Sequence, residues 1–174
     1  MQVRADALQR AFLGLGGNIV DVLANMATAL QNLDRRPDTV VVSVSSVYRT
    51  PPWGIENQDW FLNACAGVDT SLSPTALLDA GLQIEGLLKR ERRERWGPRT
   101  LDIDILTFGN ESVLTEQLTI PHPRMHEREF VLRPLADIAP DLAILGSSCL
   151  ELLREMPKSG IEKLDLRDEW WKLA

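Results

Sequence analysis

The sequence predicts an α+β fold, namely a ferredoxin-like βαββαβ antiparallel sheet with helices packed on it and a C-terminal extension. Segments with the period of strands and segments with the period of helices follow in the order strand, helix, strand, strand, helix, strand. The chain has 174 residues, 44% of them hydrophobic and 25% charged, an ordinary composition for one domain. We therefore expect a single domain over residues 1–174, with a loose N-terminus at 1–10 and an extension at 142–174.

The first strand and the first helix precede Pro37. Residues 11–15 form a short apolar run typical of a strand, and apolar residues recur at helical spacing over 23–33. Asn18 or Asp21 can cap this helix, because either side chain can accept a hydrogen bond from a backbone N–H of the first turn. Pro37 cannot continue a helix and closes the segment.

A turn with three glycines, residues 14–18, connects this strand to this helix. The third glycine of the dinucleotide-binding pattern G-x-G-x-x-G is absent, because Ile19 occupies its place. The P-loop pattern G-x-x-x-x-G-K-[ST] does not occur in the chain either. We therefore expect neither a dinucleotide-binding fold nor a P-loop.

The next two strands are predicted at 39–48, which is rich in Val and Ser, and at 61–69, which alternates clearly. On the second of these, one apolar face carries Leu62, Ala64, Ala66 and Val68, and the other face carries Phe61, Asn63 and Cys65. The loop between them, residues 49–60, contains two prolines, a glycine and two tryptophans and is too long for a tight hairpin. Its aromatic rings either contact a flat ligand or pin the loop to the core.

The second helix begins at Ser73 and Pro74, a cap followed by a proline in the first helical position, and its apolar stripe continues to Leu88. The last strand of the pattern begins at Leu101 after a glycine–proline turn and ends before the Gly-Asn pair at 109–110. These two elements complete the βαββαβ order.

Asp102 and Asp104 lie on this last strand, directly after a basic cluster. Residues i and i+2 of a strand point to the same face about 6 to 7 Å apart, so the two carboxylates would attract a cation such as Mg²⁺. The cluster at 89–99 holds six basic and two acidic residues, a local charge of +4 in a chain of formal net charge −6. Alone, these signals are typical of a solvated helix end and a wet strand face. Their adjacency favours a polyphosphate site.

The C-terminal third has few chemical signals. Residues 118–124 predict an extended segment that leads into a short helical piece, and 130–140 predict a helix that covers the core. His122 and His126 have the spacing of a zinc pair on a helix, but Pro123 puts the first outside the helix and no H-E-x-x-H motif is present. We expect no protein-bound zinc. The two cysteines, Cys65 and Cys149, lack metal-ligand spacing and are expected to be reduced packing residues.

The overall charge and hydropathy exclude several classes of protein. A pI near 5.0 argues against a general binder of nucleic acid or anionic membranes. The polar N-terminus lacks the apolar core of a signal peptide, and no segment approaches the roughly 20 apolar residues of a membrane span. We therefore expect a cytoplasmic protein.

Four segments resemble the 6-hydroxymethyl-7,8-dihydropterin pyrophosphokinase family, and the resemblance spans residues 12–142. They are GLGGN at 14–18, YRTPPWG at 48–54 with FLNA at 61–64, RWGPRTLDIDIL at 95–106, and IPHPR at 120–124 with REF at 128–130. The third segment is highly specific, and all four occur in order. Two positions depart from the family pattern: Gly17 replaces a usual serine and Lys89 a usual glycine. The second departure stiffens the loop that carries Arg90 and Arg92.

The resemblance implies transfer of the β,γ-diphosphate of ATP to the hydroxymethyl oxygen of 6-hydroxymethyl-7,8-dihydropterin, with release of AMP, in folate biosynthesis. It implies two Mg²⁺ ions, both bound by Asp102 and Asp104. The catalytic residues that it implies are Arg90, Arg92, Arg95, Arg99, Asp102 and Asp104. The ATP-binding residues that it implies are Arg92, Arg95, Trp96, Arg99, Ile105, His122, Pro123 and Arg128. No general base is evident, so catalysis should rest on positioning and charge stabilisation.

For the pterin, the resemblance implies a ring that stacks between two aromatic side chains and accepts or donates hydrogen bonds along its edge. The residues so implied are Thr50, Pro51, Pro52, Trp53, Phe61, Asn63 and Phe130. The partners are then the two small substrates alone, without nucleic acid or membrane, and we expect a monomer.

Two alternatives remain at this point. A ferredoxin-like sheet that bears aromatics is also typical of an RRM-like RNA-binding module, against which stand the acidic pI and the lack of an RNP1-like strand. A catalytically inactive pterin-binding relative is the other, against which stand Asp102, Asp104, Arg95 and Arg99.

Overall fold

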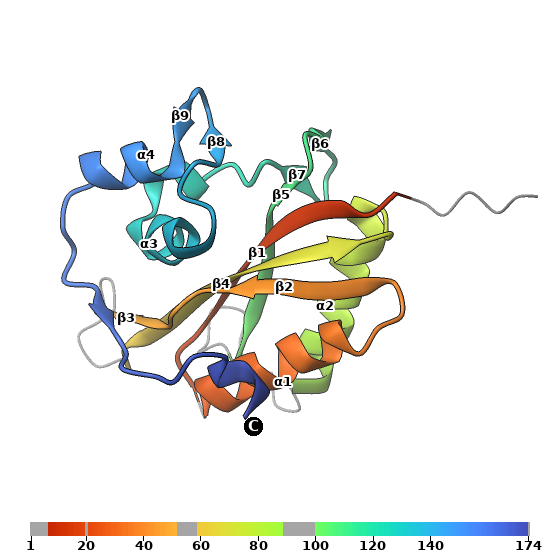
Figure 1. Cartoon of the computed structure of the whole chain (residues 1–174), viewed down its shortest axis with the longest axis horizontal. Coiled ribbons are helices and arrows are strands. Elements are labelled where there is room, and N and C mark those ends of the chain that lie inside the picture. Colours follow the sequence, from red (N-terminus) through yellow and green to blue (C-terminus); the bar gives the residue numbers. More distant parts are fainter. Residues whose placement is uncertain (1–6, 20, 52–58, 89–99, 174) are drawn as a thin grey trace, which may run out of the picture.

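The computed structural model describes residues 7–19, 21–51, 59–88 and 100–173, and its centre is an antiparallel sheet (Figure 1). The sheet order is β10-β3-β4-β1-β5, and β2 also pairs with β4. The strands are β1 (Gln9–Gly17), β2 (Thr39–Val44), β3 (Tyr48–Thr50), β4 (Phe61–Thr70), β5 (Asp102–Phe108) and β10 (Glu162–Lys163). If β2 and β3 are taken as one interrupted strand, this is the predicted ferredoxin-like order.

One expected strand, at 39–48, is therefore two strands. Ser45 lies in the interruption, where its Oγ accepts a hydrogen bond from the Cys65 backbone N–H at 2.8 Å and its own N–H donates to the Cys65 carbonyl at 2.9 Å. Both halves still pair with β4, so the topology is unchanged. At the N-terminus, β1 begins at Gln9, two residues before the expected start.

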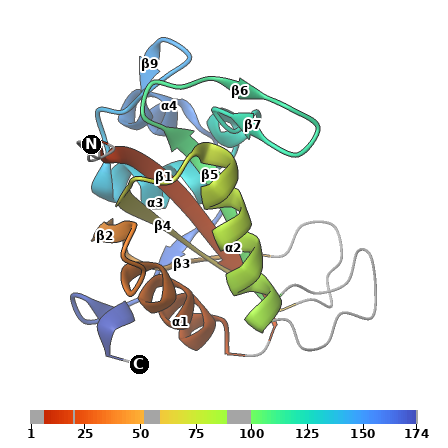
Figure 2. The same ribbon diagram turned by 90° about the vertical axis from the view of Figure 1, so that its right-hand side faces the viewer.

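The two predicted helices, α1 (Val22–Asp34) and α2 (Pro74–Leu88), lie on the same face of the sheet, as expected (Figure 2). The Asp21 carboxylate caps α1 by accepting from the Ala24 N–H at 3.1 Å, and the Ser73 hydroxyl accepts from the Ala76 N–H at 3.2 Å. Both helices bury their apolar faces against the sheet in one cluster that includes Leu13, Leu15, Met26, Leu30, Leu77, Ile103 and Ile105.

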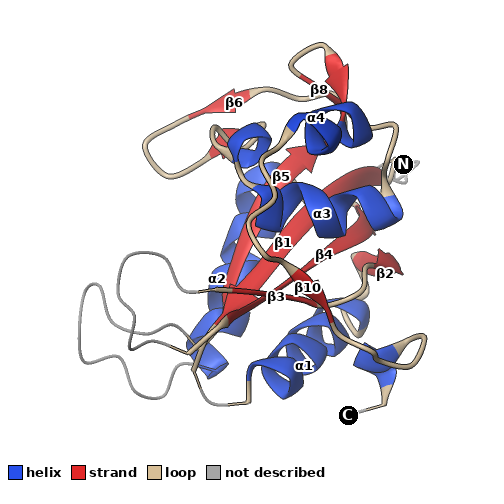
Figure 3. Cartoon of the chain, turned by 90° about the vertical axis from the view of Figure 1, so that its left-hand side faces the viewer, coloured by secondary structure: helices blue, strands red, loops and turns tan. Residues whose placement is uncertain are grey.

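The opposite face of the sheet is also covered, by α3 (Glu129–Ile138) and α4 (Cys149–Glu155) (Figure 3). A second apolar cluster lies there and includes Phe12, Cys65, Leu106, Leu132 and Cys149. Cys65 is completely buried under α3, as expected for a packing residue, so the second face of β4 also lies in the core. Cys65 is small enough for α3 to pack closely on the strand, and an alternating pattern that marks one core face does not reveal that the other face is covered as well.

The remaining elements are short. The predicted extended segment and short helical piece are β7 (Thr119–Ile120), which pairs with β6 (Val113–Leu114), and the 3-10 helix η1 (Met125–Glu127). A second hairpin joins β8 (Ala143–Ile144) to β9 (Ser147–Ser148), and η2 (Trp170–Lys172) lies near the C-terminus. No helix within the described ranges is long and apolar enough to cross a membrane.

Candidate active site

Several predicted site residues lie in rows across one face of the sheet. Asp102 of β5 pairs with Gly16 of β1, which pairs in turn with Asn63 of β4. Directly paired residues of an antiparallel sheet point to the same face, so the Asp102 carboxylate and the Asn63 amide share the face on which α3 lies. Neighbouring strands are about 4.8 Å apart, which puts Asp102 and Asn63 about 10 Å apart across a glycine. Asp104 lies in the next row, opposite Gly14.

The two aspartates are on the side of β5 that reaches solvent. Asp104 is exposed and Asp102 is half-buried, while Ile103 between them is buried against α2. Only oxygen donors are present in this pair, which suits Mg²⁺ better than zinc, and an octahedral ion held by two carboxylates still needs other oxygen ligands, such as phosphate or water. Within the described residues no group of three His, Cys, Asp or Glu side chains could hold a metal ion.

Glu85 of α2 bonds to the strand residue between the two aspartates. The sequence did not predict this role. The Ile103 backbone N–H donates to Glu85 Oε1 at 2.7 Å, and the glutamate is only 8% exposed. This buried carboxylate therefore holds β5 at the residue between Asp102 and Asp104. The sequence signal that could have identified this role of Glu85 is an acidic residue next to Ile84 within the apolar stripe of a helix.

His122 lies beside the aspartate strand as a neutral hydrogen-bond donor. Its backbone N–H donates to the Leu106 carbonyl at 2.8 Å, and its Nδ1 accepts from the Arg124 N–H at 3.2 Å, so the proton of the neutral ring is on Nε2. Burial lowers the pKa of His122, and the charges of Arg128 and Arg124 lower it further, while Asp104 opposes them. The charges of Asp104 and Arg128 thus both act on the His122 imidazole.

The second half of the candidate site is built on β3 and β4. Asn63 Nδ2 donates to Thr50 Oγ1 at 3.3 Å, and both residues are buried. Phe61 pairs with Thr50 across the two strands and is half-buried. Phe130, in the first turn of α3, is half-buried as well, and the Arg128 guanidinium lies 5.6 Å from its ring centroid. The buried amide and hydroxyl supply polar groups, and the two rings supply flat apolar surfaces.

The remaining predicted residues divide into three sets. Ile105 is buried in β5, Pro51 is half-buried and Pro123 is exposed. Trp60 is 39% exposed and packs on the Arg49 guanidinium, which lies 4.6 Å from its ring centroid. Pro52, Trp53, Arg90, Arg92, Arg95, Trp96 and Arg99 lie outside the described residues, and their predicted roles stay predictions.

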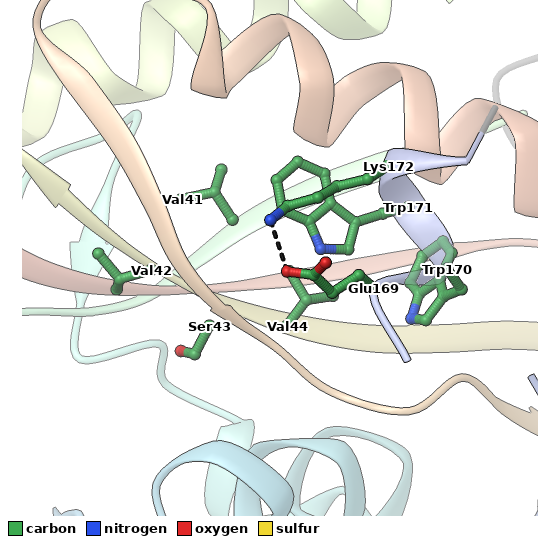
Figure 4. Close-up of a pocket in the computed structure, with 8 residues that line it drawn as sticks. All are labelled: Val41, Val42, Ser43, Val44, Glu169, Trp170, Trp171 and Lys172. Atoms are coloured by element: carbon green, nitrogen blue, oxygen red, sulfur yellow. Dashed lines mark hydrogen bonds and ion pairs between the residues drawn. The ribbon is translucent and has the colours of Figure 1, made fainter. Parts of the chain in front are cut away.

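A hollow elsewhere on the molecule does not belong to this site. It lies between β2 and η2 and is lined by residues 41–44 and 169–172 (Figure 4). The Lys172 ammonium and the Glu169 carboxylate form an ion pair of 2.5 Å at its edge. None of the predicted site residues lines it.

Carboxylates, a guanidinium and an imidazole donor that meet at one end of the sheet are the groups of an enzyme that handles phosphate esters. The sequence pattern of one such family, 7,8-dihydro-6-hydroxymethylpterin-pyrophosphokinase (HPPK), matches residues 12–140. This match covers most of the chain, and the chain belongs to the HPPK family.

Similar proteins agree with this assignment. The 2-amino-4-hydroxy-6-hydroxymethyldihydropteridine pyrophosphokinase of Methylorubrum extorquens is 49% identical over 158 residues, which are 91% of this chain and 100% of that protein. The Pseudomonas aeruginosa protein of the same name is 44% identical over 158 residues, 90% of this chain and 98% of that one. Among solved structures, Plasmodium falciparum HPPK-DHPS, wild type with SDX-DHP, has a TM-score of 0.69 at 18% identity over 88% of this chain. The chain spans 45% of that longer protein, and the likeness supports the fold alone.

Proposed function

We propose that this protein transfers the β,γ-diphosphate of ATP to the hydroxymethyl oxygen of 6-hydroxymethyl-7,8-dihydropterin, releasing AMP, as a step of folate biosynthesis. Membership of the HPPK family and the names of the bacterial relatives support this reaction. The observation that carries it is the row from Asp102 through Gly16 to Asn63, which sets the carboxylate proposed to bind metal and the amide proposed to bind the acceptor about 10 Å apart on one face. The reacting phosphate and the acceptor hydroxyl must therefore meet between the Asp102 and Asn63 side chains.

The proposal assigns Mg²⁺ to Asp102 and Asp104, with two ions as the expected number. The donor set fits, because both residues offer oxygen ligands at a solvent-facing strand edge. When bound, Mg²⁺ would neutralise phosphate charge and orient the phosphates for in-line transfer. The chain's own contribution is to hold the two carboxylates in register, through the pairing of β5 with β1 and the bond from Ile103 to Glu85.

The phosphates would be bound by cationic and neutral donors around the aspartates. His122 offers Nε2–H while its Nδ1 is held by the backbone of Arg124, so it can donate without adding charge. Arg128 offers a guanidinium, and Arg90, Arg92, Arg95 and Arg99 are proposed for the same task. We assign adenine to the backbone at Ile105 with Trp96 and Pro123 nearby.

The acceptor would lie on the other side of Gly16. Phe61 and Phe130 present rings for stacking on the pterin, and the Asn63 amide and Thr50 hydroxyl present groups that can bond its edge. Pro51, Pro52 and Trp53 complete the proposed site. We further propose a monomer that acts in the cytoplasm, where both small substrates are used, without nucleic acid.

A coupled assay for AMP tests the proposal. The purified protein, ATP and 6-hydroxymethyl-7,8-dihydropterin should yield AMP and the pterin diphosphate in equal amounts, and EDTA should stop the reaction. No AMP in the presence of Mg²⁺ would contradict the proposed function. Pterin binding without AMP would favour the inactive relative, and RNA retained at physiological salt without AMP would favour the RNA-binding alternative.

A further inference from the structure

The segment at 158–163, which we call the C-terminal strap, lies outside the family match at 12–140 and beside the proposed acceptor site. It passes the N-terminal end of α3 and continues as β10 along the edge of β3 (Figure 3). Two walls of the proposed acceptor site come from these two elements, because α3 carries Phe130 and β3 carries Thr50.

The strap is bound to α3 directly next to Phe130. Both the backbone N–H and the hydroxyl of Ser159 donate to the same Glu129 oxygen, at 2.9 Å and 2.5 Å. The Glu129 side chain is only 9% exposed, while Ser159 lies at the exposed surface. Its other oxygen faces Arg133 at 3.6 Å, one helical turn away on α3 itself.

The same strap is also bound to β3. Glu162 pairs with Arg49 in the β10–β3 ladder, and their side chains form an ion pair. Gly160, at a φ of +79°, makes the turn in which the strap passes Pro51, since a Cβ at Gly160 would be 3.7 Å from Pro51 Cγ. A left-handed φ of this kind favours glycine.

The far end of α3 has its own connection to the sheet. The Tyr48 hydroxyl donates to the Asp137 carboxylate at 2.9 and 3.0 Å, and the Ser46 N–H donates to it at 3.2 Å. Helix α3 is thus tied to the β3 region at its C-terminal end by Asp137 and at its N-terminal end by the strap. The N-terminal tie is the one beside the proposed pterin ring.

We propose that the C-terminal strap is a positioning element of the acceptor site, in which Ser159 and Glu129 hold Phe130 at its working distance from Thr50 and Phe61. This inference rests on the proposed function. Since ATP is assigned to the other side of Gly16, loss of the Ser159–Glu129 bonds should weaken pterin binding and leave nucleotide binding unchanged.

The test compares single substitutions by titration calorimetry, with the pterin and with an ATP analogue as separate ligands. Ser159→Ala and Glu129→Ala should raise the Kd for the pterin about 3- to 10-fold. This change is smaller than the full contribution of a charge-assisted hydrogen bond, because the bond acts on the pterin only through Phe130. Glu129→Gln keeps an acceptor oxygen and should recover part of the affinity. Arg133→Ala is the matched control, because it removes the other partner of Glu129 and leaves the strap bonds in place.

A double-substitution cycle tests whether Ser159 affects pterin binding through Phe130. In a Phe130→Ala background, Ser159→Ala should cause no further loss of pterin affinity. Unchanged pterin affinity in Ser159→Ala and Glu129→Ala, or an equal loss of pterin and nucleotide affinity, would overturn the positioning role while the proposed function stands. A wild-type protein that binds no pterin would overturn both.

Discussion

Asp102 and Asp104 mark the point at which one face of β5 changes from solvent to core. Asp104 is exposed and Asp102 half-buried, whereas Leu106, two residues further along the same face, is 1% exposed in the second apolar cluster. The carboxylates are therefore anchored by a buried strand end while their oxygens remain reachable. An exposed carboxylate can also be removed without opening a cavity in the core.

We predict that Asp104→Ala abolishes turnover and preserves the fold. Loss of a ligand that positions charge at the reacting phosphate should reduce AMP release by about 100-fold or more. The measurement is AMP release at saturating substrates and Mg²⁺, with circular dichroism to verify folding. Asp141→Ala, which removes an exposed aspartate outside the site, is the control. Wild-type turnover in Asp104→Ala would rule out the metal assignment.

We predict that His122 makes the free protein more stable above pH 6.5 than below it. Burial lowers the pKa of His122 from its ordinary value of 6.5, so the unfolded chain binds the proton more readily than the folded one. This contribution to stability is complete above pH 6.5 and is lost as pH falls through the lowered pKa. NMR titration of the imidazole without Mg²⁺ and ATP, with thermal unfolding of His122→Gln for comparison, checks it. An imidazole pKa above 6.5 would contradict the prediction.

At the scale of elements, β1 separates the two halves of the site, and two of its glycines face the site side. A Cβ added at Gly16 would lie 2.7 Å from Asn63 Oδ1, whereas a Cβ at Gly14 would meet only Leu106 carbons at 3.5 Å or more. The first contact forces the amide to move, and the second is an ordinary van der Waals contact.

We therefore predict that Gly16→Ala weakens pterin binding and that Gly14→Ala does not. Displacement of the Asn63 amide should break its bond to Thr50 and raise the pterin Kd roughly 10-fold, the effect of about one hydrogen bond. Calorimetry on both variants measures this difference. Equal affinity in the two variants would show that the Asn63 amide does not contact the ligand.

The connection between α2 and β5 gives a second prediction at this scale. Glu85→Leu leaves the Ile103 N–H without its carboxylate partner, so the free energy of unfolding should fall by roughly 1–3 kcal/mol. Glu85→Gln keeps an acceptor oxygen and should lose less. Urea unfolding measures both, with Asp79→Ala on the exposed side of α2 as the control. A Glu85→Leu protein as stable as wild type would remove the structural role assigned to this carboxylate.

At the scale of the whole molecule, the sheet carries an apolar cluster on each face, and both free cysteines belong to the cluster under α3 and α4. Burial raises the pKa of the Cys65 thiol well above its usual range and raises the pKa of the Cys149 thiol to about 11. The Cys65 and Cys149 sulfurs lie 3.7 and 3.6 Å from the carbonyls of Val131 and Leu132 in α3.

We predict that neither cysteine reacts with DTNB in the native protein at pH 8. A cysteine reacts with DTNB only if the reagent can reach the sulfur and the thiol is ionised, and burial prevents both. Two thiols per chain should react only in denaturant, at a rate that follows global unfolding. Rapid modification of one thiol without denaturant would show that the cluster under α3 opens locally.

The C-terminal extension belongs to the same folded body. Beyond β10, the Leu164 N–H donates to the Val47 carbonyl at 2.9 Å, the Trp170 indole donates to the Ser45 carbonyl at 3.0 Å, and Trp171 is 6% exposed. These contacts bind the extension to the interrupted strand of the sheet. We propose on this basis that the chain forms one domain, as composition and length led us to expect.

The sequence by itself determined the order of the main elements, the cap at Ser73, the choice between Asn18 and Asp21 as the first cap, and the position of Asp102 and Asp104 on one strand face, because these depend on local periodicity and neighbouring residues. The four motifs of the family could be found in the sequence as well, because each is a continuous segment of neighbouring residues. Apart from Arg90 and Arg92, they contain the residues proposed for the site, whether or not these fall in the described ranges.

Only the tertiary structure decided which distant segments meet. The burial of the Cys65 face under α3, the bond from Ile103 to Glu85 and the strap between Glu129 and Arg49 each join residues that no local pattern relates. The alternation along β4 marks one buried face and does not show that the other face is covered too. A glutamate on a helix is not distinguished as buried until its partner strand is placed. The carboxylates could thus be found from the sequence, while the packing that holds them and the acceptor side in register could not.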